Sequence, residues 1–262
     1  MIYITGDIHG NPNRFNNRCF YEQKEMPKED QDKNFMIILG DFGLVWNDKG
    51  ETPEEKSNLD ILNNRSFTTL FIDGNHDCHT RLREYPTGIW HGGKVHFIRP
   101  HVIHLMRGQV YEIEGKTFFA FGGASSHDIK DGILDPNDFV DYDDFRRTYR
   151  EWNHQHKLFR VKGISWWPEE LPSEEEMEEG LKNLSLHNNS VDYILTHSPY
   201  TSLLKQMDGG SGLYKNDILT DYLQKIKQNV DYNCWFCGHM HVNQRYDWER
   251  TICLYEQITR IL

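Results

Sequence analysis

The chain begins with the stretch Met1-Ile-Tyr-Ile-Thr-Gly6-Asp7-Ile8-His9-Gly10, in which an apolar segment runs directly into glycine, aspartate and histidine. Alternate residues of an extended segment point to the same side, so Asp7 and His9 can converge on one ion while the two glycines let the backbone turn sharply. Taken alone, the motif is also compatible with an ordinary turn in which Asp7 caps a helix. The stretch predicts a pair of ligands at the end of a buried strand.

The same pattern, a short apolar segment followed by polar residues, recurs along the chain. The segments and the polar residues after them are residues 35–39 with Asp41, 68–72 with Asn75 and His76, 191–195 with His197, and 232–237 with His239 and His241. A helix is predicted between the second and third strands by Thr52-Pro53-Glu54-Glu55, which supplies an N-cap, an N1 proline and a capping-box acid. Strand, helix and strand in succession predict parallel pairing, with the polar motifs at the strand ends where ligands bind in open α/β sheets.

Length, charge and cysteine content restrict the class of protein. With 262 residues, the chain is long enough for a layered core, and we expect residues 1–262 to form a single domain. A net charge of −11 disfavours a long nucleic-acid duplex as partner but leaves small phosphorylated ligands open, because bound cations would offset it. The absence of a basic, apolar leader and of any membrane-length apolar run favours a cytoplasmic protein without membrane contact. Five irregularly spaced cysteines favour reduced thiols.

Two regions depart from the alternation of strand and motif. Residues 94–122 contain short apolar segments separated by Arg-Pro, Arg-Gly and Glu-Gly, which predicts antiparallel strands. Residues 125–186 read as a polar excursion with two helices, the first with aromatic residues from Tyr142 to Trp152 at helical spacing and the second starting at Ser173. Because the excursion leaves a strand that should end near the motifs, we expect it to border the active site.

The five motifs together offer carboxylate, amide and imidazole groups. Single aspartates after glycine are most often turn formers and single histidines are most often structural, but five such strand ends in one domain predict a metal site. Nitrogen and oxygen ligands without thiolate suit manganese, iron or zinc. Cys234-Trp-Phe-Cys237 has C-x-x-C spacing, but the two cysteines face opposite sides of an apolar strand, so we interpret them as structural.

The order of these motifs carries a resemblance to a known family. In chain order they are Gly6-Asp-Ile-His-Gly10, Gly40-Asp41, Gly74-Asn-His-Asp77, Thr196-His197 and Gly238-His-Met-His241. The set resembles the five motifs of the calcineurin-like metallophosphoesterase superfamily and spans nearly the whole chain. The resemblance implies an α/β fold in which a two-sheet sandwich is flanked by helices, a four-layer architecture.

The resemblance also implies a site with two divalent metal ions and a role for each side chain. Asp7, His9 and His241 would hold one metal, Asn75, His197 and His239 the other, Asp41 would bridge the two, and His76 would stand beside the phosphate as a catalytic non-ligand. Two cations about 3.5–4 Å apart can share a carboxylate and a hydroxide that attacks phosphorus. His76 could then protonate the leaving oxygen or donate a hydrogen bond to the transition state.

Departures from the family pattern reduce the number of activities that the resemblance allows. In the branch that contains protein serine/threonine phosphatases and symmetrical dinucleoside-polyphosphate hydrolases, the second motif continues to a further aspartate and a phosphate-gripping arginine. Here the sequence is Gly40-Asp-Phe-Gly-Leu-Val-Trp46, which has neither residue, and Asp77 stands where the protein phosphatases have glutamate. Both activities are therefore disfavoured.

Weaker signals surround this set. The stretch Gly122-Gly-Ala-Ser-Ser-His127 follows a strand but lacks the full phosphate-loop pattern, so a turn is one interpretation; its position near the same sheet edge makes His127 a candidate substrate-binding residue. Trp166 and Trp167 could stack on a base, although packing onto the core is the more frequent explanation of such a pair.

We predict a dinuclear metal-dependent phosphoester hydrolase acting on a phosphodiester or a small phosphorylated metabolite or nucleotide. One alternative is a nuclease on single-stranded nucleic acid, guided by a basic strip of Arg146, Arg147 and Arg150. Another is a non-catalytic phosphoesterase-like module that binds a partner protein. Because all the proposed ligands and His76 are present, the sequence favours the enzyme.

Overall fold

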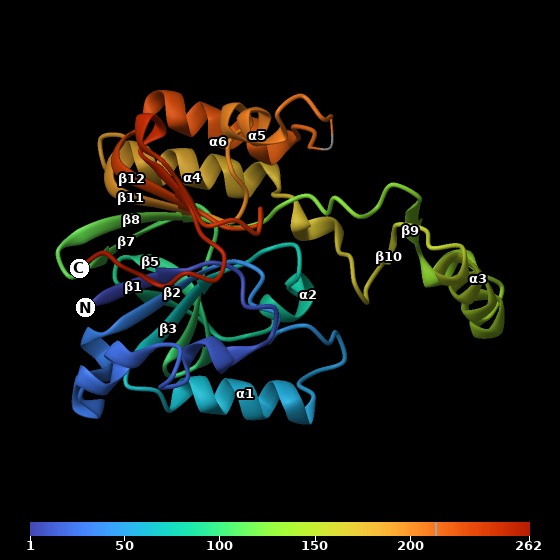
Figure 1. Cartoon of the computed structure of the whole chain (residues 1–262), viewed down its shortest axis with the longest axis horizontal. Helices are drawn as coiled ribbons and strands as arrows, with labels where there is room; N and C mark the ends of the chain where they lie inside the picture. The colour runs from blue at the N-terminus through green and yellow to red at the C-terminus, as the bar shows by residue number, and fades with distance from the viewer. Residues whose placement is uncertain (213) are drawn as a thin grey trace.

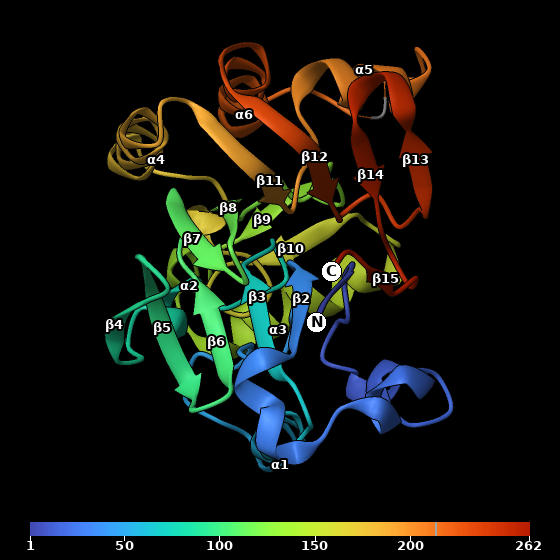
Figure 2. The same cartoon turned by 90° about the vertical axis from the view of Figure 1, so that its left-hand side faces the viewer.

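Two large β-sheets lie face to face in the computed structural model, which describes residues 1–212 and 214–262 (Figure 1). In this described part, the first sheet contains, in spatial order, β15 (Thr259–Arg260), β1 (Ile2–Thr5), β2 (Phe35–Leu39), β3 (Thr68–Ile72), β6 (Val102–Leu105), β5 (Gly93–Arg99) and β4 (Thr87–Trp90). Strands β1, β2, β3 and β6 are parallel to one another, as predicted for the strand–helix–strand segment. The strand β15 closes the sheet antiparallel to β1, so the two chain ends lie side by side (Figure 2).

The second sheet is also mixed, with a parallel centre. Its spatial order is β13 (Gln244–Tyr246), β14 (Thr251–Cys253), β12 (Asp231–Cys237), β11 (Ser190–Thr196), β8 (Lys116–Phe121) and β7 (Gln109–Ile113). The antiparallel strands predicted for residues 94–122 are present as the pairs β5–β6 and β7–β8. The connection between β6 and β7 carries the chain from the first sheet to the second, which the sequence pattern did not indicate.

Alternating side chains along the strands build the layers. On β2, Phe35, Ile37 and Leu39 point toward the second sheet and join a core cluster with residues such as Phe118 and Phe236 from that sheet. The intervening residues of β2 pack on the opposite face against helix α1 (Pro53–Asn63). Because both faces of the strand are buried, its sequence is continuously apolar.

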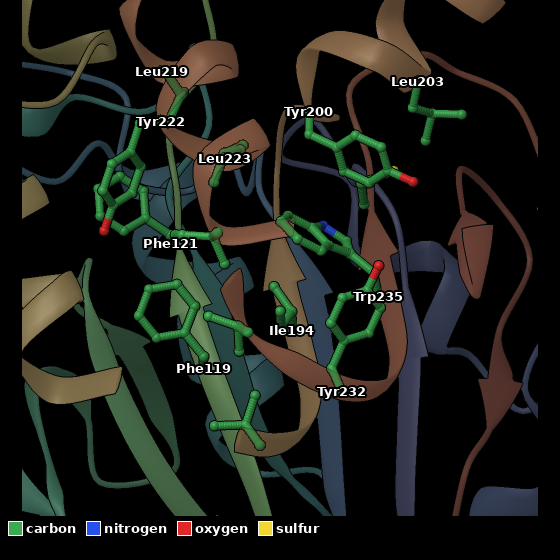
Figure 3. Close-up of a cluster of buried hydrophobic side chains, with 14 of the residues drawn as sticks. Phe119, Phe121, Ile194, Tyr200, Leu203, Leu219, Tyr222, Leu223, Tyr232 and Trp235 are labelled. Atoms are coloured by element: carbon green, nitrogen blue, oxygen red, sulfur yellow. The ribbon is translucent and has the colours of Figure 1, made fainter. Parts of the chain in front are cut away.

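Helices cover both outer faces. On the first sheet, α1 begins as predicted: Glu55 N donates to Thr52 Oγ1 (3.1 Å) and Thr52 N donates to a Glu55 side-chain oxygen (2.7 Å). On the second sheet lie α4 (Glu174–Leu186), α5 (Thr201–Asp208) and α6 (Ile218–Asn229) (Figures 1 and 2). Trp235 of β12 lies fully buried in the cluster that joins this sheet to its helices, as Figure 3 shows. Two sheets flanked by helices are the fold class that the resemblance implied, and the structure confirms it.

An arm, residues 127–166, leaves the second sheet after β8 and extends beyond the end of both sheets (Figure 1). It contains β9 (Gly132–Leu134), α3 (Tyr142–His154) and β10 (Phe159–Val161), with β9 and β10 pairing in parallel. Its small apolar cluster contains Leu134, Phe145 and Val161. The second helix predicted within residues 125–186 is α4, which packs on the second sheet and is separate from the arm.

Short elements complete the chain. They are the helix α2 (His79–Leu82) after β3 and the 3₁₀ helices Pro12–Phe15, Tyr21–Glu25, Lys28–Lys33, Pro136–Asp138, Pro168–Glu170 and Asp247–Glu249. The predicted structural cysteines agree with the fold, because Cys234 faces the core between the sheets while Cys237 faces the helices, and both are free thiols.

Candidate metal centre

The motifs that follow β1, β2, β3, β11 and β12 meet at one edge of the sandwich. The first three strands belong to one sheet and the last two to the other, so the side chains converge from both sheets. The residues that the sequence proposed as ligands, Asp7, His9, Asp41, Asn75, His197, His239 and His241, all lie in this cluster.

One group of side chains combines Asp7, His9, Asp41 and His241. One potential ligand atom from each lies within 4.8 Å of those from the others. His241 Nε2 is 3.2 Å from Asp7 Oδ2, and His9 Nδ1 is 3.7 Å from Asp41 Oδ2. Two carboxylates and two imidazoles in this arrangement could hold a divalent cation.

A second group combines Asp41, His197 and His239, so Asp41 belongs to both groups. His197 Nε2 lies 3.2 Å from Asp41 Oδ1 and 3.4 Å from Asn75 Oδ1, which brings the amide oxygen of Asn75 to the same place. The two oxygens of Asp41 therefore face different groups, Oδ2 toward His9 and Oδ1 toward His197.

The backbone is unusual at these positions. His9, Asp41, His239 and His241 adopt positive φ angles of 46°, 45°, 65° and 50°. Residues other than glycine rarely adopt this left-handed conformation, which costs of the order of 1–3 kcal/mol each and is concentrated at functional sites. Close approach adds a second constraint, because a Cβ at Gly40 would lie 2.3 Å from His197 Nδ1. Sharp, strained turns thus direct several imidazoles and Asp41 into one small volume.

Three observations test whether the cluster suits a cation. Asp7 Oδ2 is buried and accepts no hydrogen bond, although His241 Nε2 lies only 3.2 Å away. The Nε2 atoms of His9 and His241 are 3.1 Å apart, so two imidazoles direct ring nitrogens at each other. Burial opposes ionisation of Asp41, yet His197, His76 and His239 hold its pKa well below the ordinary value. An unpaired oxygen of Asp7, two ring nitrogens directed at each other and an ionised Asp41 fit a divalent cation.

The electrostatics of His197 point the same way. Burial disfavours its charged form, but Asp41 and Asp7 outweigh burial and raise its pKa to about 10. Asp41 and Asp7 therefore stabilise positive charge at this position. A bound metal ion would supply positive charge of the same kind. His197 Nδ1 donates to the carbonyl oxygen of Leu39 (2.6 Å), which directs Nε2 toward Asp41 Oδ1 (3.2 Å). A bound cation would take the place of the Nε2 proton there.

Partners behind the cluster orient its members. Ser126 donates from its backbone N (2.9 Å) and its Oγ (2.6 Å) to the two oxygens of Glu170, and Asn75 Nδ2 donates to Ser126 Oγ (3.4 Å). With its NH₂ group engaged there, Asn75 presents its oxygen to the centre. Asp77 accepts from the backbone N–H groups of Gly43 (2.9 Å) and Gly74 (2.8 Å), which ties the loops after β2 and β3 together.

His76 lies beside the two groups. Its backbone N–H donates to Asp41 Oδ1 (2.8 Å), and its ring stacks on Trp46, which in turn packs edge-on against Trp167. Trp167 is buried, in agreement with the packing interpretation of the tryptophan pair. Burial lowers the pKa of His76 to about 4, with Asp41 opposing and Arg160 adding to the shift. The imidazole is therefore neutral at neutral pH.

The structure also brings residues to the centre that the sequence did not identify. Arg160, from β10 of the arm, places its Nη2 atom 3.0 Å from His76 Nε2. Arg14 donates to the carbonyl oxygens of Gly6 (3.2 Å) and Asp7 (2.8 Å) and so supports the first loop. The Arg160 contact spans 84 positions and could not be predicted from local spacing, whereas Arg14 lies only seven or eight residues from its partners but in no recognised motif. The candidate His127 does reach the cluster: its Nε2 lies 2.8 Å from His239 Nε2.

Comparison with known proteins identifies the class. The sequence profile of the family described as calcineurin-like phosphoesterase matches residues 1–243. The chain therefore belongs to the calcineurin-like phosphoesterase family, as the resemblance implied, and is a metal-dependent phosphoester hydrolase.

Similar solved structures include a phosphopantetheinyl hydrolase from Mycobacterium tuberculosis (TM-score 0.43, 16% identity, covering 97% of this chain and 87% of that one). Another is a chain assigned as a 5′-nucleotidase from Staphylococcus aureus, solved with α-ketoglutarate (TM-score 0.44, 13% identity, covering 97% of this chain and 48% of that one). Comparison with curated proteins gives no match. Among the described residues, none of the helices combines the length and apolar character needed to cross a bilayer.

Proposed function

We propose that the chain is a dinuclear phosphoester hydrolase whose substrate is a phosphodiester or a small phosphorylated metabolite or nucleotide. The proposal rests on one observation: Asp41 belongs to both groups of potential ligand atoms, and its two oxygens face one group each. In this assignment Asp7, His9 and His241 hold one divalent ion, Asn75, His197 and His239 hold the other, and Asp41 is shared. The donor set suits manganese, iron or zinc.

Divalent ions bound here would lower the pKa of water and offset the charge of a phosphoryl group. The protein's own groups position the reaction. Asp41 fixes the backbone of His76, and Trp46 supports its ring, so the imidazole stands beside both ligand groups. Because this ring is neutral in the free protein, it donates one hydrogen bond at first. It becomes a proton donor to the leaving oxygen only after the negative substrate raises its pKa.

A cleft supports a substrate larger than phosphate itself. It has a volume of about 1010 Å³ and runs from His9 past Trp46 to the arm, where Tyr142 and Phe145 line it. Lys49 and Lys162 lie in the same lining together with acidic side chains. Mixed aromatic and polar walls suit the organic part of a phosphoester.

The test is a comparison of substrates on protein loaded with manganese. We expect two metal ions per chain by elemental analysis and hydrolysis of at least one of a chromogenic monoester, a chromogenic diester and a panel of nucleotides. One ion or none after loading would contradict the dinuclear assignment. Loaded protein inert toward the whole panel would favour the non-catalytic module.

The nuclease alternative receives less support from the arm. Arg146 and Arg147 lie exposed on α3, but Arg147 pairs with Asp144, and further acidic residues share the helix. Because its positive charge is neutralised in this way, the basic strip attracts single-stranded nucleic acid only weakly. Weak, salt-independent binding of single-stranded DNA is the expected result, and a steep salt dependence would revive the alternative.

A further inference from the structure

Arg160 is the point at which the arm touches the centre. It lies on β10, its side chain is 12% exposed, and its guanidinium group points back toward His76. The same guanidinium is anchored within the arm: Nε and Nη2 donate to the two oxygens of Asp128 (2.7 Å each), and Nη1 donates to the carbonyl oxygen of Ser165 (3.2 Å). The group is therefore held in one orientation before any ligand arrives.

At least one N–H donor of Arg160 has no acceptor. Arg160 has five N–H donors. Asp128 and Ser165 take three of them, and the remaining two, one on each terminal nitrogen, face His76: Nη2 is 3.0 Å from Nε2 and Nη1 is 3.4 Å from Nδ1. A neutral imidazole accepts through only one ring nitrogen, because the other carries its proton. At least one N–H on this edge thus lacks an acceptor beside the metal ligands.

We propose that Arg160, held beside His76, binds the phosphoryl oxygens of the substrate from the arm. The proposal rests on the proposed function and adds a substrate-binding residue to it. A planar guanidinium edge matches the spacing of two phosphate oxygens and is more effective there than a lysine point charge. The second motif, residues 40–46, contains no arginine, and Arg14 behind the first loop donates to the backbone carbonyl oxygens of Gly6 and Asp7, so the arm supplies the cationic donor that faces His76.

A structural role is the competing explanation, in which Arg160 only fastens the arm to His76. The two roles predict different results when the affinity for phosphate is measured. A fastening residue affects the position of the arm and of His76 but not the affinity for a bare phosphate ion. A phosphate-binding residue lowers that affinity directly, and its loss can be partly replaced by free guanidinium, which restores the missing donors.

The experiment uses full-length, manganese-loaded protein with the variants Arg160→Ala and Arg160→Lys, and Arg150→Ala as matched control. Arg150 is an exposed arginine on α3 of the same arm, so the control removes the same charge at a distance from the centre. Calorimetry measures the binding of inorganic phosphate, and kcat and KM are measured on a chromogenic diester. Elemental analysis confirms equal metal content.

For Arg160→Ala we expect roughly a 10²-fold loss of kcat/KM, typical of one electrostatic donor, with phosphate binding weakened about tenfold and partial rescue by guanidinium chloride. Arg160→Lys should keep the fold and recover only part of the loss. Arg150→Ala should match the wild type.

Phosphate affinity and kcat/KM within twofold of wild type in Arg160→Ala would overturn the proposal while leaving the hydrolase intact. If Arg160→Ala misfolds, the lysine variant decides in the same way. Wild-type protein that binds phosphate through Arg160 yet hydrolyses no substrate would instead contradict the proposed function alone.

Discussion

Two clusters of ionisable side chains lie close together at the end of β3, and they are built differently. The first is the candidate metal centre, in which His9 and His241 are exposed. The second surrounds Asp73, whose carboxylate accepts from Arg107 Nε (2.9 Å) and Nη2 (2.5 Å) on one oxygen and lies 3.2 Å from His104 Nε2 on the other. His96 and His79 complete this second group, and all of its members are buried.

The difference lies in the source of positive charge. Around Asp73 the chain itself provides a cation, Arg107; burial, together with Arg107, lowers the pKa of His79 to about 3, so His79 remains neutral. At the metal centre the described residues supply no such arginine among the ligand atoms, Asp7 Oδ2 has no hydrogen-bond donor, and imidazoles face each other. A cluster of histidine and aspartate therefore indicates a metal only where its charge is not already compensated by the chain.

The largest expected effect comes from Asp41→Ala, which removes a ligand atom from both groups. We expect metal occupancy and turnover to fall together, to no measurable activity, because two cations would then repel each other without the shared carboxylate. Elemental analysis and a thermal melt with and without manganese give the readouts: added metal should raise the Tm of the wild type but not that of the variant. Full occupancy in Asp41→Ala would show that the two groups do not share this residue.

A smaller effect is expected from His76→Ala, which should retain its metals because the imidazole lies beside both ligand groups. Turnover should fall by roughly the 10²–10⁴-fold typical of a positioned acid–base group. The loss should be greater with an alkoxide leaving group, which needs a proton, than with an acidic phenol. Equal losses on the two leaving groups would exclude proton donation, and loss of metal would make His76 a ligand.

Mutation of the Asp73 cluster should change the stability of the fold. Burial alone would raise the pKa of Asp73, but Arg107 and the hydrogen bond from His104 hold it well below its ordinary value. A depressed pKa stabilises the fold above the unfolded value of about 3.9, and this contribution is lost as the pH falls. Arg107→Met should thus lower the free energy of unfolding by about 3–5 kcal/mol at pH 7, and by less at pH 4, where Asp73 can accept a proton.

Chemical denaturation at the two pH values measures this effect. Arg83→Met is the matched control, because Arg83 borders the same cluster but is half exposed and pairs loosely with Glu176 (3.9 Å). Its cost should stay below about 1 kcal/mol. If Arg107→Met were no less stable than this control, or if its cost rose at pH 4, the structural assignment of the cluster would be wrong.

The sequence predicted features that depend on local pattern. The strand ends and the capping box of Thr52 and Glu55 could be predicted, because spacing along one segment determines them, whereas the two-sheet fold class was implied by the family resemblance. The meeting of the candidate ligands could be inferred only through their order in the chain, which carries the family resemblance.

Features that depend on tertiary contacts could not be predicted from the sequence. Arg160 reaches His76 across 84 positions, and Arg107 reaches Asp73 across 34, and neither arginine belongs to a motif. The left-handed backbone at Asp41 and His239 was also hidden, because such φ angles are imposed by surrounding structure against the local preference of the residue. The excursion was recognised as polar, but its division into the arm and the packed helix α4 follows from contacts of Leu184 with the second sheet.

The candidate ligands come from both sheets, which has a consequence for how the protein is made. His9 and His241 face each other across 232 positions of sequence. A ribosome adds about 5–20 residues per second, so the first ligands are synthesised roughly ten to fifty seconds before the last. During that interval the nascent chain holds only part of each ligand set and cannot discriminate between metals by its finished geometry. The choice of metal therefore belongs to the completed polypeptide and depends on which ions the surroundings offer after release.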